Sequence, residues 1–97
     1  MTYEQEITST PVTLVEFYAS WCPHCQRMMP LVAEIKQLLA GKADVHQFDV
    51  DKNPELTDAE RVESYPTFII YKNGKEMWRQ SGEMDPQVLL NKVESYL

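Results

Sequence analysis

The stretch EFYASWCPHCQRMMP, from Glu16 to Pro30, holds both cysteines of the chain, with two residues between them. It overlaps the run PVTLVEFYA (Pro11–Ala19), which is β-branched, aromatic and almost continuously apolar. Such a run is typical of a strand that is buried on both faces of a sheet. It leads into an apolar stripe with helical spacing, formed by Met28, Leu31, Val32, Ile35 and Leu39. The cysteines are therefore predicted to lie where a buried strand turns into a long helix.

The helical pattern continues past Pro30, so this proline is expected to kink the helix without ending it. We expect Gly41 to close the helix as its C-terminal cap. The run DVHQFDV (Asp44–Val50) predicts a second strand. After it, Asn53 can cap a short helix that has Pro54 at its first position.

Two further strands are predicted at Thr67–Lys72 and Lys75–Gln80, because Asn73-Gly74 between them is a strong hairpin signal. Asp85 then caps a final helix whose apolar face is formed by Leu89, Val93, Tyr96 and Leu97. The predicted order is β-α-β-α-β-β-α. We expect one α/β domain over residues 1–97, in which the first three strands are parallel and the hairpin adds an antiparallel edge strand.

The composition excludes several classes of protein. The chain has 97 residues, 43% of them hydrophobic, which is enough for a core. A net charge of −6 without any basic run argues against nucleic-acid binding. No apolar run could span a membrane, and MTYEQEITST is not a secretory signal, so we expect a cytoplasmic protein. The low net charge per residue and the small size give no reason to invoke an oligomer, so we expect a monomer. The segment TYEQEI (Thr2–Ile7) is expected to form one short element of undecided type.

Closely spaced cysteines serve zinc sites, structural disulfides and redox centres. A structural zinc site needs four ligands, and His24 and His46 are the only further soft candidates. A structural disulfide between Cys22 and Cys25 closes too short a loop to stabilise much. The positive end of a helix dipole favours a thiolate, which is the nucleophile of disulfide exchange. The sequence thus favours a redox centre in which Cys22 attacks and Cys25 resolves, with no metal.

The same stretch, together with FDVDKNP (Phe48–Pro54), SYPTFIIYKNGK (Ser64–Lys75) and Ser81-Gly82, resembles the thioredoxin family over nearly the whole chain. The resemblance implies the thioredoxin fold, with a central mixed sheet of about four strands flanked by helices. It also implies a thiol–disulfide oxidoreductase that needs no cofactor. Its partners would be protein disulfides or dithiols, and a reductase or small thiols would recycle it.

The resemblance also assigns roles to single residues. Pro66 matches the family's cis-proline, which faces the active cysteines and presents the backbone of Tyr65 to an extended substrate. Trp21, beside the first cysteine, matches a residue on which substrates dock. Gly82 matches a glycine on the rim of the substrate groove. Tyr18 stands where the family often has tryptophan.

One departure from the family lies between the cysteines, where Pro23-His24 replaces the usual Gly-Pro. This dipeptide resembles the active site of the bacterial disulfide oxidase, which shares the fold but carries an inserted helical domain. His24 could donate a hydrogen bond to the Cys22 thiolate, or add positive charge, and so stabilise the reduced form. We therefore expect a disulfide less reducing than that of a typical thioredoxin. Disulfide oxidation or isomerisation, and a non-catalytic binding module, remain as alternatives.

A second departure is Glu16, which occupies the position of the family's buried aspartate. If it is buried, its pKa should rise, and it could exchange a proton with Cys25. Gln47 replaces the lysine that pairs with that aspartate, which should raise the pKa of the acid further. The alternative is a solvated Glu16 at the mouth of the strand.

Overall fold

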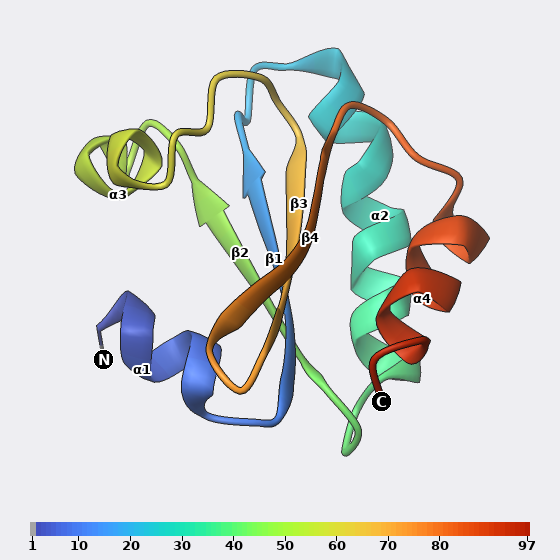
Figure 1. Cartoon of the computed structure of the whole chain (residues 1–97). Coiled ribbons are helices and arrows are strands. Elements are labelled where there is room, and N and C mark those ends of the chain that lie inside the picture. Colours follow the sequence, from blue (N-terminus) through green and yellow to red (C-terminus); the bar gives the residue numbers. More distant parts are fainter. Residues whose placement is uncertain (1) are drawn as a thin grey trace.

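A four-stranded sheet in the order β2-β1-β3-β4 separates two layers of helices in the computed structural model, which describes residues 2–97 (Figure 1). Helices α1 and α3 lie against one face, and helices α2 and α4 against the other. The strands are β1 (Val12–Tyr18), β2 (Asp44–Asp49), β3 (Thr67–Lys72) and β4 (Lys75–Ser81), and the helices are α1 (Tyr3–Thr8), α2 (Pro23–Leu38), α3 (Pro54–Ala59) and α4 (Pro86–Glu94). The thioredoxin fold is confirmed, and a leading helix precedes the predicted order of elements.

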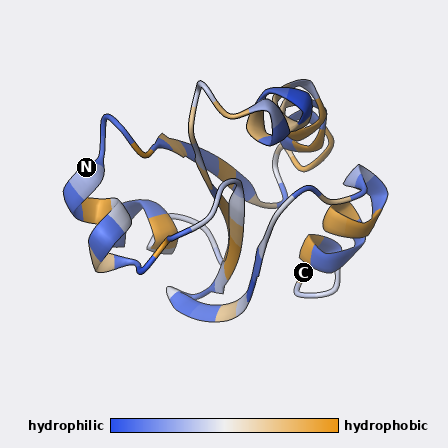
Figure 2. Ribbon diagram, turned by 90° about the horizontal axis from the view of Figure 1, so that it is seen from above, coloured by the Kyte–Doolittle hydropathy of each residue, from blue (hydrophilic) through white to orange (hydrophobic). Residues whose placement is uncertain are grey.

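Strand β1 is buried on both faces, as its apolar run predicts. Leu14 packs in the core that β1 and β3 form with α2 and α4, whereas Phe17 packs in the core on the α1 and α3 side. The apolar stripes of α2 and α4 turn toward the sheet, and their polar faces turn outward (Figure 2). Because successive side chains of a strand point to opposite faces, β1 supplies side chains to both cores.

The predicted direction of β3 is wrong. Strand β2 runs parallel to β1, but β3 runs antiparallel to it, with Thr67 opposite Phe17 and Lys72 opposite Val12. Helix α3 and the residues that follow it stay at the edge of the sheet where β2 ends (Figure 1). Strand β3 therefore starts from that edge and runs back along β1.

The helix boundaries match the sequence signals only in part. Helix α2 runs through Pro30, as expected, but it ends at Leu38 with Leu39 as its C-cap. Gly41, the predicted cap, lies in the following turn with φ +81°. Asp85 caps α4 as predicted, since its Oδ1 accepts a hydrogen bond of 2.8 Å from the backbone N–H of Gln87.

Asn53 is the N-cap residue of α3 without a capping bond from its side chain, which instead donates to the carbonyl oxygen of Asp49 at 2.9 Å. The undecided segment at the N-terminus is α1, which is closed by a capping box between Thr2 and Gln5. The helix is fixed to the sheet by the Tyr3 hydroxyl, which lies 2.8 Å from that of Tyr71.

The hairpin turn also contacts α1, which yields a stability prediction. Gly74 has φ +81°, and a Cβ added to it would lie 2.6 Å from Thr8 Cγ2. Gly74→Ala should therefore lower the free energy of unfolding by more than the ~1–2 kcal/mol of the left-handed backbone alone. Gly41→Ala is the matched control, because it has the same φ and nothing within 4 Å of its Cβ. In urea unfolding, Gly74→Ala should have a lower free energy of unfolding than Gly41→Ala. Adding Thr8→Ser, which removes Cγ2, should make the two losses equal. Equal losses for both glycines in the presence of Thr8 would contradict the contact.

Candidate active site

The two cysteines lie at the junction of β1 and α2. The backbone N–H of Cys22 donates to the carbonyl oxygen of Ala19 at 3.1 Å, and the N–H of Ala19 donates to Cys25 Sγ at 3.4 Å. Cys22 is the N-cap of α2 and Pro23 is its first residue, so the cysteines lie at the predicted junction of strand and helix. Both thiols are free, but Cys22 is 8% exposed and Cys25 is 0% exposed. Only Cys22 is therefore within reach of a large partner.

The surroundings of Cys22 favour its thiolate. Its sulfur accepts no capping hydrogen bond, yet the nearby backbone N–H of Cys25 is the largest influence that lowers the pKa of this thiol. The Cys25 thiol, the backbone N–H of His24 and the charge of Arg27 lower this pKa further, while desolvation opposes them. A thiol with a lowered pKa is ionised more fully at neutral pH and so attacks disulfides more readily.

Cys25 has the opposite properties. Burial raises the pKa of its thiol to about 11, against the hydrogen bond that its sulfur accepts from Ala19. The Cys22 thiol and the charges of Cys22 and Glu16 raise the pKa further. Cys25 must therefore lose its proton to a base before it can attack, and Glu16 is a carboxylate whose charge acts on this thiol.

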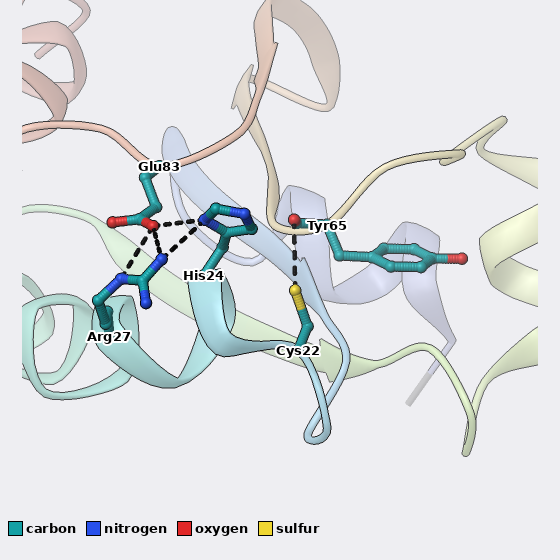
Figure 3. Close-up of polar contacts among 5 residues, drawn as sticks. All are labelled: Cys22, His24, Arg27, Tyr65 and Glu83. Atoms are coloured by element: carbon teal, nitrogen blue, oxygen red, sulfur yellow. Dashed lines mark hydrogen bonds and ion pairs between the residues drawn. The ribbon is translucent and has the colours of Figure 1, made fainter.

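The loop before β3 contacts Cys22. The Tyr65–Pro66 peptide is cis, and the Cys22 thiol donates to the carbonyl oxygen of Tyr65 at 3.8 Å (Figure 3). Gly82, with φ +98°, donates its N–H to the carbonyl oxygen of Pro66 at 2.8 Å. The three residues that the resemblance places around the groove thus gather opposite the accessible cysteine.

Trp21 directly precedes Cys22 in the chain, and its side chain is 61% exposed. Its indole Nε1 donates to Asp51 Oδ2 at 2.8 Å, and its ring meets that of Tyr65 edge to face at 6.2 Å between centroids. An exposed tryptophan held by a hydrogen bond and an aromatic neighbour offers a pre-ordered apolar surface. Nothing in the sequence pattern singled out Asp51 as its partner.

Glu16 is fully buried, with 0% exposure, so the alternative of a solvated carboxylate is wrong. Its Oε1 accepts a hydrogen bond of 2.9 Å from Gln47 Nε2, and its Oε2 has no hydrogen-bond partner among residues 2–97. Burial raises the pKa of Glu16, and the bond from Gln47 opposes this rise. A half-satisfied buried carboxyl with a raised pKa is suited to carry a proton.

His24 points away from the cysteines. Its Nδ1 contacts Glu83 Oε1 and lies 3.0 Å from Arg27 Nη2, and Figure 3 shows the ring turned toward this pair. In the chain as described from Thr2 onward, the hydrogen bond that we expected between the imidazole and Cys22 is not formed. The sequence pattern did not indicate Arg27 or Glu83 as part of the site. His24 and Arg27 are nevertheless three residues apart in a helix, a spacing that places these two side chains on one face.

The described part of the chain shows no group of three or more His, Cys, Asp or Glu side chains that could hold a metal ion. His24 contacts Glu83, and His46 lies on β2 with its Nε2 3.9 Å from Asp44 Oδ2, so the two histidines do not converge on the cysteines. No helix within residues 2–97 has the length and apolar character needed to cross a bilayer.

Comparison with known proteins agrees with this geometry. The family model described as Thioredoxin matches residues 1–95. Over 92 residues the chain is 39% identical to "Thioredoxin Y, chloroplastic" of Oryza sativa, covering 95% of this chain and 54% of that protein. It is 33% identical to "Thioredoxin 1" of Nostoc sp., covering 99% and 91% of the two chains. The chain thus spans about half the length of the chloroplast relatives that it matches.

Among solved structures, a thioredoxin from Plasmodium falciparum superposes with a TM-score of 0.87 at 30% identity, covering 98% of this chain and 91% of that one.

Proposed function

This chain belongs to the thioredoxin family, and from that premise we propose that it is a thiol–disulfide oxidoreductase acting on protein disulfides through Cys22 and Cys25. The observation that carries the proposal is the contrast between the two thiols. The pKa of Cys22 is lowered at an accessible helix start, whereas burial raises that of Cys25 one helical turn along. One thiol is ready to attack, and the other is protected until a mixed disulfide forms beside it.

In the reducing direction, the Cys22 thiolate attacks one sulfur of a substrate disulfide. The substrate S–S bond breaks, a mixed disulfide forms, and the departing thiolate takes up a proton. Cys25 then loses its proton, with Glu16 as the base, and attacks the Cys22 sulfur. The second substrate sulfur leaves as a thiol, so the substrate gains two electrons and two protons while Cys22 and Cys25 become a disulfide.

The substrate is proposed to lie as an extended segment in the gap between Cys22 and the loop before β3. The Tyr65 carbonyl, which now accepts from the Cys22 thiol at 3.8 Å, would accept from the substrate backbone instead. Pro66 and Gly82 form one wall, and Trp21 provides the apolar surface at the other side. Peptide recognition of this kind relies on main-chain hydrogen bonds, so it suits many protein substrates.

The direction of electron flow depends on the redox potential and on the compartment. We propose that the Pro23-His24 dipeptide makes the disulfide less reducing than that of a typical thioredoxin, although the His24 ring now faces Glu83. In a cytoplasmic setting, as predicted, a single-domain monomer would reduce protein disulfides and be recycled by a reductase or small thiols. The dipeptide favours disulfide formation or isomerisation as the second candidate function.

The test is the equilibrium between the dithiol and the disulfide in glutathione buffers, read by alkylation and mass spectrometry, together with reduction of insulin disulfides. A reductase should turn over insulin with dithiothreitol and hold a potential somewhat less reducing than the about −270 mV of thioredoxin, whereas a value equal to it would show that the dipeptide has no effect. A potential near −120 mV, with oxidation of reduced substrates, would support the oxidase role. A chain whose cysteines form no disulfide in any buffer would overturn the proposal.

A further inference from the structure

Glu83 lies in the loop between β4 and α4, and its carboxylate connects this loop to the start of α2. Its Oε1 accepts from Arg27 Nε at 3.0 Å, and it also contacts Arg27 Nη2 and His24 Nδ1 (Figure 3). Arg27 Nη2 lies 3.0 Å from His24 Nδ1, so the three side chains form a closed cluster. The Arg27 guanidinium and the His24 imidazole, both in the first turns of α2, are therefore bound to one carboxylate.

The position of this carboxylate is fixed by the fold. Glu83 follows Gly82, whose N–H is bonded to the Pro66 carbonyl oxygen at 2.8 Å. Two residues later, Asp85 caps α4 through hydrogen bonds to the first turn of that helix. With anchors on both sides, the loop holds Glu83 beside α2, so the carboxylate is placed before any substrate arrives.

We propose that Glu83 is a positioning residue of the redox centre. It holds the His24 imidazole and the Arg27 guanidinium away from the Cys22 sulfur. The disulfide therefore stays more reducing than the Cys-Pro-His-Cys sequence alone would make it. The inference rests on the proposed function, because it concerns the potential of the same cysteine pair. It accounts for a Cys-Pro-His-Cys sequence in which the histidine ring makes no contact with the attacking thiol.

The charges around Cys22 support this assignment. Arg27 lowers the pKa of Cys22, so a carboxylate that fixes the Arg27 guanidinium acts on this thiol through Arg27. The contacts with Arg27 and His24 lower the pKa of Glu83 to about 2, so its negative charge persists wherever thiol chemistry is measured. Without that charge, the freed Arg27 guanidinium and a hydrogen bond from the freed His24 imidazole would stabilise the Cys22 thiolate and hence the dithiol form.

The experiment compares Glu83→Gln and Glu83→Ala with the native chain in glutathione buffers. Both variants should shift the equilibrium toward the dithiol by roughly three- to tenfold, as expected for one charge acting at a partly exposed site. The alkylation rate of Cys22 as a function of pH should show a lower pKa in both. Glu76→Gln is the matched control, because Glu76 also pairs with an arginine, Arg79, but lies on β4.

A second comparison, made in a chain that carries His24→Gln, tests whether Glu83 acts through His24. In a His24→Gln chain, Glu83→Gln should shift the equilibrium less than in the native chain, because only Arg27 remains to be released. Thermal unfolding of both redox forms separates tuning from damage, since a merely structural loss lowers both melting temperatures alike and leaves the equilibrium unmoved.

Potentials of both Glu83 variants equal to that of the native protein would overturn the inference, and so would a shift toward the disulfide or a shift of the same size in Glu76→Gln. In those cases the native chain still exchanges with glutathione. A native chain that does not exchange would instead defeat the proposed function.

Discussion

Replacing Cys22 with serine should abolish the reduction of insulin disulfides, with turnover falling on the order of a thousandfold or more to the background set by other thiols. The reason is geometric, because Cys25 is 0% exposed and burial raises the pKa of its thiol to about 11. Cys25 can neither reach a protein disulfide nor ionise readily at neutral pH. The measurement is insulin reduction with dithiothreitol as the electron source.

Replacing Cys25 should have a different result from replacing Cys22. A Cys25→Ser chain keeps the Cys22 thiol, so it should attack a substrate once and accumulate as a mixed disulfide, visible as an added mass that dithiothreitol removes. The double serine variant is the control, since it should form no adduct while keeping its fold. Turnover by Cys25→Ser equal to that of the native chain would contradict intramolecular resolution, and full biological function of the double variant would favour a binding module.

The sequence predicted those parts of the fold that depend on local signals. Pro54 at the start of α3, Asp85 as a cap and Asn73-Gly74 in the hairpin turn each act within a few residues. The direction of β3 could not be predicted in this way. A strand buried on both faces has the same apolar pattern whether it runs parallel or antiparallel to its neighbour, so the pattern leaves the direction open.

The sequence predicted those parts of the site that depend on local signals and missed those that depend on contacts between distant residues. The cysteine pair and its place at a helix start follow from the change in hydrophobic period between β1 and α2. The cis peptide at Pro66 came only from the resemblance, because most bonds before proline are trans. The contact of Glu83 with Arg27 joins residues 56 positions apart, and no local pattern indicates it. The orientation of His24 depends on that contact and was therefore missed.

Glu16→Gln should slow the resolution of a mixed disulfide on the order of a hundredfold at pH 7, the lower end of what a positioned general base contributes. The thiol of Cys25, with its pKa raised to about 11, needs a base, and an amide cannot serve as one. The glutamine side chain keeps the acceptor oxygen for Gln47, so the hydrogen bond of 2.9 Å survives. Stopped-flow measurement of the second step should show a rate that rises with hydroxide concentration in the variant, whereas the native rate levels off once Glu16 has ionised.

The same substitution should raise stability, and the effect depends on pH. Burial raises the pKa of Glu16 above that of the unfolded chain, so ionisation is costlier in the native state. The unfolded chain loses the proton first, and the native state becomes less stable as pH rises from the unfolded pKa to the folded one. Glu16→Gln removes this penalty, which predicts a gain near zero at pH 4 and about 1–3 kcal/mol at pH 8 in urea unfolding.

Thr13→Val is the control for both effects, because Thr13 is equally buried in β1 but lies at the far end of the strand from Cys25. It should change the free energy of unfolding without changing the resolution rate or its pH profile. A Glu16→Gln chain that resolves at the native rate would show that another base takes the proton of Cys25. A stability gain that is the same at pH 4 and pH 8 would show that the pKa of Glu16 is the same in the native and the unfolded state and that the gain comes from packing.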